Sequence, residues 1–483
     1  MKSLNLIEKL RNLLYIFQLE EYNIGRFLNW IKYHKVWLGL EKKKKLIWTT
    51  KTKLIFLLAL SFWIISLLLL AFLFFSKFNL IFAIPLTLVV LFIYFRFIYI
   101  FLVITALVIK PLEQLIKKKI VWQAKQKLKK FPNLKVIGIS GSFGKTSTKE
   151  FLYQMLSSKF KVLKTPGNIN TTLGIAYLIL TDLSPEIEIF IVEMGAYKRG
   201  DIKEICQLVK PQIGILTALN ETHLERFKSM ENIIKTEFEL IESLPQDGLA
   251  IINNDNKHCQ KNYKRFLKSR VCFYSVEGEA VSGLRARDIQ ASKEGISFEI
   301  IFKEGGSLKV FSTLLGRHNA ENLLRAIAAA KECKMSLEEI KKSLENIKAA
   351  PHRLFMTKKA NGITIIDDTY NGNPDGVKAA IEVLSKFKDQ RKIYVTPGLV
   401  ELGERTKEIH IEIGRNLAQV VNLVILIKNS TTPFLLEGLK QLNFLEEKIL
   451  IFPDAFEMQK NLPSILESGD VILFQNDWPD NYF

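Results

Sequence analysis

The chain has 483 residues, which is enough for two or three domains, and it carries a formal net charge of +19. Its four cysteines are far apart and form no Cys-x-x-Cys pair, so neither a disulfide framework nor a zinc site is expected, and a reducing compartment fits. Residues 1–130 hold 22 Lys and Arg against 5 Glu, whereas residues 131–483 hold 46 basic and 44 acidic residues. A nucleic-acid-binding domain would carry its basic residues on a folded surface, so no nucleic-acid partner is expected.

Two long apolar stretches stand beside these basic residues. Residues 54–75 contain no charge, and residues 80–109 are apolar except for Arg96. Their lengths are typical of membrane-spanning helices, which predicts a hairpin over residues 51–110 with spans at about 54–75 and 80–109. Lysines flank both outer ends, so the positive-inside rule places both chain termini in the cytoplasm, at the cell membrane, with the lipid bilayer as a partner.

Arg96 allows two interpretations: a tolerated charge that reaches the interface, or the point where the second helix leaves the bilayer core. Residues 1–50 mix apolar and basic positions, which predicts an amphipathic helical segment on the membrane or on the hairpin. An ordinary helix packed on the rest of the protein is the alternative. Residues 111–131 are expected to form a basic linker helix that leads out of the membrane.

A phosphate-binding loop is predicted where the apolar run of residues 135–139 meets a Gly-rich turn followed by a helical pattern. Glycines let backbone N–H groups approach phosphate oxygens, and the helix N-terminus favours negative charge. Lys145 would reach the β- and γ-phosphates, and Thr146 would ligate Mg²⁺. The strict pattern is missed by one residue, because Ile139 stands where the first glycine belongs, so a Gly-rich turn without this function is the alternative. The candidate nucleotide-binding residues here are Gly141, Ser142, Gly144, Lys145, Thr146 and Ser147.

Five further segments follow the loop in order, at residues 165–174, 189–196, 220–229, 316–322 and 367–374. The second is an apolar strand that ends in Glu193, where a carboxylate can hold a Mg²⁺ ligand position near the loop. Each segment alone has an ordinary explanation, such as a turn at Asn-Gly or Asn-Pro. All six in this order over about 230 residues are hard to assign to chance.

This series resembles the Mur ligase family, and most of all its D-alanyl-D-alanine-adding type, from about Lys135 to Asp470. The resemblance rests on residues 146–150, 193–196, 352–355 and 367–374, with residues 401–403 and His410 resembling a further segment. It implies an α/β fold, with a P-loop central ATPase domain at 132–350 and a Rossmann-like C-terminal domain at 351–483. Strands that alternate with helices favour mainly parallel sheets in both domains.

The resemblance also implies an ATP-dependent amide ligase of cell-wall precursor synthesis, with ATP and Mg²⁺. ATP would phosphorylate the carboxylate of a muramoyl-tripeptide, and D-Ala-D-Ala would attack the acyl phosphate. Lys145 would then be catalytic, Thr146 and Glu193 would ligate one Mg²⁺, and His223 would help to hold a second. Asn319 would contact adenine, while Arg353 and Asp368 would hold phosphate and ribose. The substrate residues implied are Asn168, Asn170, Thr171, Tyr370, Asn371 and Asn373.

One departure from the family concerns a lysine that usually follows the serine of the 223–229 segment by eight residues and carries CO₂ as a carbamate. Here that count from Ser229 reaches Glu237, and Lys235 lies two places earlier. We hypothesise that Glu237 supplies a permanent carboxylate and belongs to the catalytic set. Its shorter reach would require a shift of the backbone.

The other departure is that the membrane hairpin occupies the place of the family's N-terminal UDP-sugar domain. The acceptor is then either a lipid-linked precursor or a soluble UDP-linked one used by a merely localised enzyme. A relative that ligates another amino acid, such as a folate polyglutamate or lipid-linked muramoyl type, is a second possibility. A membrane-anchored nucleotide-binding scaffold without catalysis is a third. The incoming amino acid and the oligomeric state stay open.

Overall fold

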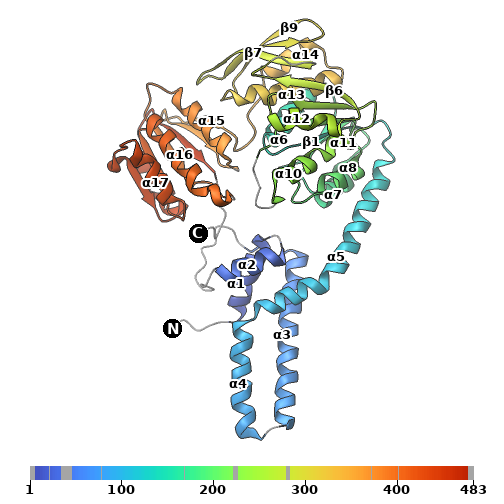
Figure 1. Ribbon diagram of the computed structural model, residues 1–483, viewed down its shortest axis with the longest axis vertical. Helices are drawn as coiled ribbons and strands as arrows, with labels where there is room; N and C mark the ends of the chain where they lie inside the picture. The colour runs from blue at the N-terminus through green and yellow to red at the C-terminus, as the bar shows by residue number, and fades with distance from the viewer. Residues whose placement is uncertain are drawn as a thin grey trace. The chain divides into compact units, whose positions relative to one another are not determined.

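The protein is described by a computed structural model for residues 6–20, 22–33, 46–77, 79–167, 169–220, 227–278, 283–370, 372–400 and 402–476. The described chain divides into two compact units, which meet between Lys119 and Ile120. The first unit is helical, and the second contains two β-sheets covered by helices (Figure 1).

The first unit is built from α1 (Leu6–Leu19), α2 (Ile24–Tyr33), α3 (Thr50–Lys77), α4 (Leu80–Arg96) and the start of α5 (Tyr99–Leu128). Helices α3 and α4 run side by side as a hairpin (Figure 1). Helix α1 packs through Leu14 and Phe17 into an apolar cluster with Ile55 of α3 and Leu102 of α5. Of the arrangements expected for the N-terminal segment, α1 therefore takes the one in which a helix packs on the hairpin region.

The stretch at residues 80–109 is divided between two helices. Helix α4 ends at Arg96, with Phe97 as its C-cap, and α5 begins at Tyr99. A residue far away in the sequence contacts this helix end: the Lys9 ammonium donates to the carbonyl of Phe95 at 2.6 Å, in the last turn of α4. Helix ends leave carbonyls without intrahelical partners, and a lysine can satisfy one of them. By length and composition alone, α3 and α5 are the described helices long and apolar enough to cross a membrane.

The first domain of the second unit is a nine-stranded sheet in the order β2-β3-β1-β4-β5-β6-β7-β8-β9. Its strands pair in parallel as far as β7, and β7, β8 and β9 are antiparallel. The strands are β1 (Lys135–Ser140), β2 (Val162–Lys164), β3 (Ile189–Glu193), β4 (Ile213–Leu216), β5 (Leu249–Asn253), β6 (Arg270–Ser275), β7 (Gly283–Ala291), β8 (Ile296–Phe302) and β9 (Ser307–Ser312). The helices are α6 (Lys145–Leu156), α7 (Thr172–Asp182), α8 (Asp201–Val209), α10 (Met230–Glu237), α11 (Glu239–Glu242), α12 (Lys257–Phe266), α13 (His318–Glu332) and α14 (Leu337–Leu344).

The second domain is a six-stranded sheet in the order β10-β11-β15-β12-β13-β14, parallel except for the pair β10 and β11. The strands are β10 (Phe355–Lys358), β11 (Thr364–Asp368), β12 (Lys392–Thr396), β13 (Leu423–Ile427), β14 (Ile449–Phe452) and β15 (Val471–Gln475). The helices are α15 (Pro374–Ser385), α16 (Thr406–Val420), α17 (Thr432–Gln441) and α18 (Ala455–Ile465), with 3₁₀ turns at Gly403–Arg405 and Glu446–Lys448. The expected α/β fold with mainly parallel sheets is confirmed.

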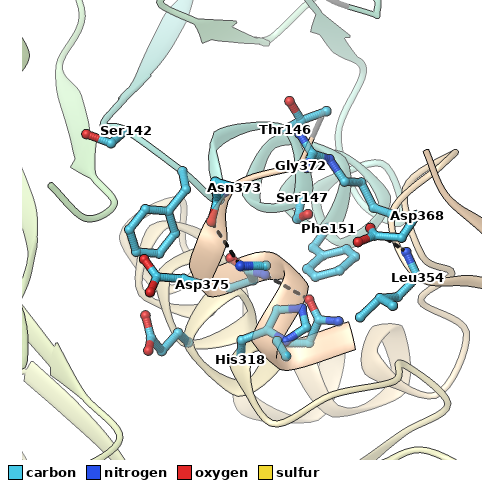
Figure 2. Close-up of a pocket in the computed structure, with 18 of the residues that line it drawn as sticks. Ser142, Thr146, Ser147, Phe151, His318, Leu354, Asp368, Gly372, Asn373 and Asp375 are labelled. Atoms are coloured by element: carbon cyan, nitrogen blue, oxygen red, sulfur yellow. Dashed lines mark hydrogen bonds between the residues drawn. The ribbon is translucent and has the colours of Figure 1, made fainter. Parts of the chain in front are cut away.

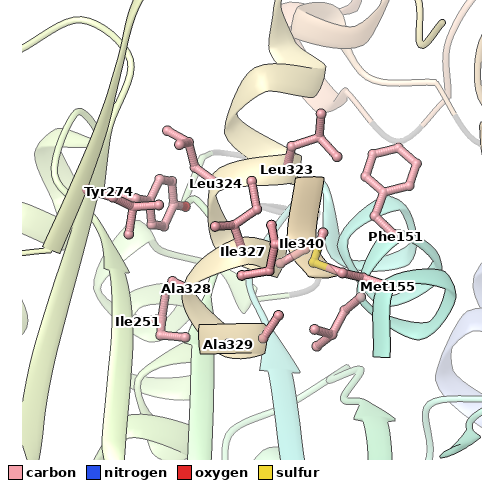
Figure 3. Packing of buried hydrophobic residues seen from close by; sticks show 14 of the residues in the cluster. Phe151, Met155, Ile251, Tyr274, Leu323, Leu324, Ile327, Ala328, Ala329 and Ile340 are labelled. Carbon is pink, nitrogen blue, oxygen red and sulfur yellow. The ribbon is translucent and has the colours of Figure 1, made fainter. Parts of the chain in front are cut away.

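Helix α13 packs against α6, and this packing brings the N-terminus of α13 to the phosphate loop. Small side chains such as Ala326 and Ala329 are fully buried, which allows a close approach, while Leu323 and Ile327 fill the space beside Phe151 (Figure 3). Strand β1 lies between β3 and β4 in the sheet, and parallel strands end at the same edge. The loop after β1 is therefore flanked by the ends of β3 and β4.

Two buried tyrosines provide a test of this packing. The Tyr274 hydroxyl donates to the carbonyl of Thr217 at 2.5 Å, whereas the buried Tyr394 hydroxyl has no hydrogen-bond partner among the described residues. Tyr274→Phe leaves that carbonyl unpaired and is expected to cost about 1–2 kcal/mol of stability. Tyr394→Phe, the matched control, removes an unsatisfied group and should be neutral or stabilising. Thermal unfolding of the detergent-solubilised chain measures both, and equal losses would contradict the prediction.

Candidate active site

The phosphate loop between β1 and α6 requires glycine at position 141. Gly141 has φ +128°, and a Cβ there would lie 2.1 Å from Oγ1 of Thr217. Its N–H donates to Oε2 of Glu237 at 2.6 Å, and the Ser140 hydroxyl donates to the Glu237 carbonyl at 3.0 Å. The start of the loop is therefore held by the C-terminal end of α10.

The remainder of the loop is bound to the segment that follows β4. The N–H of Ser142 donates to the Ala218 carbonyl at 2.8 Å, and the Thr217 hydroxyl donates to the Phe143 carbonyl at 2.6 Å. The ammonium of Lys145 turns back and donates to the carbonyl of Gly141. These bonds keep a cation in the loop at the N-terminus of α6, an arrangement that favours anion binding.

A cavity of about 160 Å³ opens between this loop, the N-terminus of α13 and the C-terminal domain (Figure 2). Figure 2 shows Ser142, Thr146 and Ser147 with Asp368 and Asn373 around the same space. The structure thus brings together residues from three separate sequence segments. The predicted site residues that line the cavity are Ser142, Gly144, Thr146, Ser147, Asn319, Arg353, Asp368 and Asn373.

Asn319 lies in the first turn of α13 and is held by two hydrogen bonds. Its Nδ2 donates to the Leu315 carbonyl at 2.8 Å, and its Oδ1 accepts from Nδ2 of Asn322 at 2.7 Å. The neighbouring His318 also lines the cavity. Burial, together with the positive charges of Arg325 and Arg353, lowers the pKa of His318 to about 4, so this imidazole is neutral near pH 7.

Asp368 and Arg353 form the C-terminal domain's charged wall. Asp368 accepts hydrogen bonds from Nε2 of Gln475 at 2.9 Å and from the N–H of Leu354 at 3.1 Å. Burial raises the pKa of the Asp368 carboxyl to about 6, against the lowering effect of Arg353 and these hydrogen bonds. The Arg353 guanidinium lies 4.6 Å from the centre of the Tyr370 ring. A carboxyl group with a shifted pKa, beside an arginine in a cavity, is typical of a functional site.

Glu193 ends strand β3 directly beside β1, where its register partner is Ile139. Its buried carboxylate lies 2.9 Å from the ammonium of Lys149, which also donates to the Gly167 carbonyl at 2.8 Å. The Glu193 oxygen of this ion pair is Oε2, which lies outside hydrogen-bond geometry with the donors of the described residues.

The oxygen donors near the loop fit Mg²⁺. This ion takes oxygen ligands, usually one or two from the protein, with phosphate and water supplying the others. The hydroxyl of Thr146 and the buried carboxylate of Glu193, which is also paired with Lys149, are ligands of that kind. The described residues contain no cluster of three or more His, Cys, Asp and Glu arranged for a metal. His223 lies outside the described residues.

The side chains of Glu237 and Lys235 have different partners. Lys235 forms an ion pair with Glu231 at 3.1 Å, one turn earlier on α10. Glu237 is buried, with its carboxylate under Gly141. Of the two, the structure therefore places Glu237 at the phosphate loop.

Several expected substrate residues have local structural partners. Thr171 accepts from the N–H of Gly174 as the N-cap of α7, and Asn373 accepts from the N–H of Gly376 as the N-cap of α15. The Asn170 carbonyl accepts from the N–H of Gly195 at 2.8 Å. Tyr370 stacks with Arg353, as described above. Asn168 and Asn371 lie outside the described residues.

The sequence did not single out Arg325, which lines the cavity with its guanidinium fully buried. It donates to Oε2 of Glu321 at 3.0 Å and to the hydroxyl of Thr148 at 3.3 Å. Its spacing of four residues from Glu321 predicts an ordinary surface ion pair on a helix. Only the Ala-rich face around it hinted that this turn of α13 is buried.

Two family models match the chain. The Mur ligase middle domain matches residues 139–330, and the Mur ligase, glutamate ligase domain matches residues 352–475. The chain therefore belongs to the Mur ligase family, which confirms the resemblance.

The relatives are more specific. The chain is 33% identical over 280 residues to the UDP-N-acetylmuramoyl-tripeptide–D-alanyl-D-alanine ligase of Escherichia coli, a match that covers 58% of this chain and 61% of that protein. It is 30% identical to the ligase of the same name from Buchnera aphidicola, with 70% and 71% covered. The chain thus matches about three fifths of the length of the Escherichia coli relative.

Solved structures agree with this likeness. A crystal structure of MurF from Acinetobacter baumannii matches with a TM-score of 0.66 and 27% identity, over 75% of this chain and 77% of that one. MurF from Thermotoga maritima, in complex with ADP, matches with a TM-score of 0.65 and 29% identity, over 75% and 80%.

The raised pKa of Asp368 predicts a pH-dependent contribution to stability. The folded state holds this proton more tightly than the unfolded state, so the stabilisation is present at low pH and is lost as pH rises through about 6. Asp368→Asn mimics the protonated form and should become more stable relative to wild type, by up to roughly 2–3 kcal/mol, between about pH 4 and about pH 8. Differential scanning fluorimetry across this range measures it. A difference in Tm that is independent of pH would contradict the assignment.

Proposed function

We propose that this chain is an ATP-dependent amide ligase that joins D-alanyl-D-alanine to the peptide of a muramoyl acceptor, with the catalytic domains, at 132–350 and 351–483, on the cytoplasmic side of a membrane. The observation that carries the proposal is a cavity in which the phosphate loop faces Arg353 and Asp368. The names of the relatives support the choice of substrates.

ATP fits the charges of this cavity. Its phosphates would lie at the N-terminus of α6, near Lys145 and against the backbone of the loop. The amide of Asn319 and the neutral ring of His318 would face the adenine end, with Asp368 at the ribose. Because Arg353 and Asp368 come from the C-terminal domain, the two domains together would enclose the nucleotide.

The reaction transfers the γ-phosphoryl group to a carboxylate of the acceptor, giving an acyl phosphate and ADP. The amine of the dipeptide attacks the acyl carbon, loses a proton, and phosphate leaves. Both first reactants are anions, so Arg353, which lines the cavity, and Lys145 of the phosphate loop would lower their repulsion. Mg²⁺, which Thr146 and Glu193 with His223 would hold, supplies further charge neutralisation when bound.

The helical hairpin is proposed to anchor the enzyme in the bilayer. Large apolar side chains of α3 and α4 are exposed, among them Leu68, Phe72 and Phe92. Exposed apolar surface of this extent is rare on a water-soluble protein and is typical of a lipid-facing one. The basic residues at both outer ends of the hairpin favour a cytoplasmic location for both termini.

A lipid-linked acceptor is a second candidate, favoured by the position of this hairpin. The family match begins at residue 139, and the hairpin precedes it in the chain. An anchored enzyme meets a lipid-linked carboxylate in the plane of the membrane, whereas a UDP-linked one arrives from solution.

The products distinguish these possibilities. Purified full-length protein with ATP, Mg²⁺, D-Ala-D-Ala and a muramoyl-tripeptide should give the pentapeptide, ADP and phosphate by mass spectrometry. Lys145→Ala, the matched inactive control, should give none. ATP binding without acceptor-dependent turnover would overturn the ligase proposal. Equal or better use of the UDP-linked than of the lipid-linked acceptor would overturn only the lipid-linked alternative.

The position of Glu237 generates a further prediction. Glu237→Gln replaces the charged hydrogen bond from Gly141 by a neutral one, which is expected to cost about 1–1.5 kcal/mol, or roughly 5- to 10-fold in kcat/KM. Lys235→Gln, a change in the surface pair with Glu231, serves as the matched control and should keep activity. Steady-state assays with and without bicarbonate test both. An enzyme that depends on Lys235 and is stimulated by bicarbonate would refute the role of Glu237.

A further inference from the structure

Helix α5 exposes a continuous apolar face along its first five turns. The side chains that form it are 42 to 64% exposed, and each lies three or four residues from another member of the set. We call this set the outer face of α5; it comprises Ile100, Ile104, Leu107, Val108, Leu112 and Leu115. An exposed apolar face of this length on a helix needs an apolar partner.

The other side of the same helix is already covered. Leu102 and Ile109 are buried in the cluster that includes Leu14 of α1 and Ile55 of α3. The residues of the outer face lie away from this contact around the helix. An apolar surface beside a proposed membrane hairpin is continuous with the surface that faces lipid.

Charged contacts at both ends of the outer face of α5 indicate how deep these ends can lie in a bilayer. At its start, Lys9 donates to the Phe95 carbonyl at 2.6 Å and lies 4.0 Å from the centre of the Phe95 ring, next to Arg96. Farther along, Lys51 at the beginning of α3 forms an ion pair with Glu113 at 3.0 Å. Charged side chains are costly in the bilayer core, so both ends belong at the level of the headgroups.

The length of α4 also fits a membrane segment that ends at the headgroups near Arg96. A single span over 30 residues, 80–109, would be about 45 Å long, against a hydrocarbon core of about 30 Å, and would put Arg96 near its middle. Helix α4 alone has 17 residues, or about 25 Å, and ends at Arg96. Figure 1 shows α5 turning away from the direction of the hairpin after α4.

We propose that α5, from Tyr99 to about Lys117, lies in the interface of the bilayer, with its outer face against the acyl chains and α4 alone as the second membrane segment. This inference rests on the proposed membrane anchor. Lys110 and Lys117 to Lys119 would meet anionic headgroups beside the outer face of α5.

The test measures how deep single added cysteines lie in the bilayer. Each cysteine carries an environment-sensitive fluorophore, and the full-length protein is reconstituted in vesicles of phosphatidylcholine and phosphatidylglycerol. Val108→Cys and Leu115→Cys report on the outer face, Lys110→Cys on the polar side of α5, and Ile65→Cys on the middle of α3. Wild-type protein, labelled in parallel, corrects for the four native cysteines. Nitroxide lipids labelled near the headgroup or near the chain end serve as shallow and deep quenchers.

The proposal expects positions 108 and 115 to be quenched more by the shallow than by the deep label, position 65 to show the reverse, and position 110 to be quenched least. Stronger deep quenching at position 108 would mean that the start of α5 lies in the bilayer core, as part of a span over residues 80–109 or as a span of its own, which overturns the proposal. Quenching at position 65 but not at 108 and 115 would also overturn it, while leaving the anchor intact. No quenching at position 65 would refute the anchor itself.

Discussion

The shape of the phosphate loop depends on one buried hydrogen bond, from the N–H of Gly141 to the carboxylate of Glu237. The loop joins a strand to a helix through four residues, too few to hold a shape by regular structure. A carboxylate that accepts from a backbone N–H forms a strong, directional bond, and here it comes from a helix 96 residues later. Thr217, at the end of β4, ties the other half of the loop through the Phe143 carbonyl. The site is therefore assembled only when β1, β4 and α10 are all in place.

Buried charge is the second constraint, and it is costly. Lys149 with Glu193 and Arg325 with Glu321 form pairs close to the loop, and Asp368 keeps a raised pKa opposite them. Buried ion pairs rarely stabilise a fold more than apolar residues of the same volume would. Three of these groups, Arg325, Glu321 and Asp368, line one cavity, which is better explained by a ligand whose own negative charge must be balanced. The phosphates of ATP are such a ligand in the proposed function.

Local patterns carried most of what could be predicted from the sequence. The strand, glycine turn and helix over residues 135–156 are specified by neighbouring residues, and so is the apolar length of α3. Arg325 was missed because its spacing from Glu321 equally suits a solvated helix, and only packing of α13 on α6 buries it. The end of α4 was left open because Lys9, which binds the Phe95 carbonyl, lies 86 residues earlier. The role of His223 still rests on the resemblance alone.

The anchor and the ligase site are linked by a short connection, since α5 ends at Leu128 and β1 begins at Lys135. If α3 and α4 hold the chain in the bilayer, as proposed, the ATP site can move only within a shell near the membrane surface. Tethering of this kind raises the effective concentration of any reactant held in the same plane, without any new contact. A soluble acceptor gains nothing from it. The same hairpin therefore gives a physical reason to consider acceptors that are themselves bound to lipid.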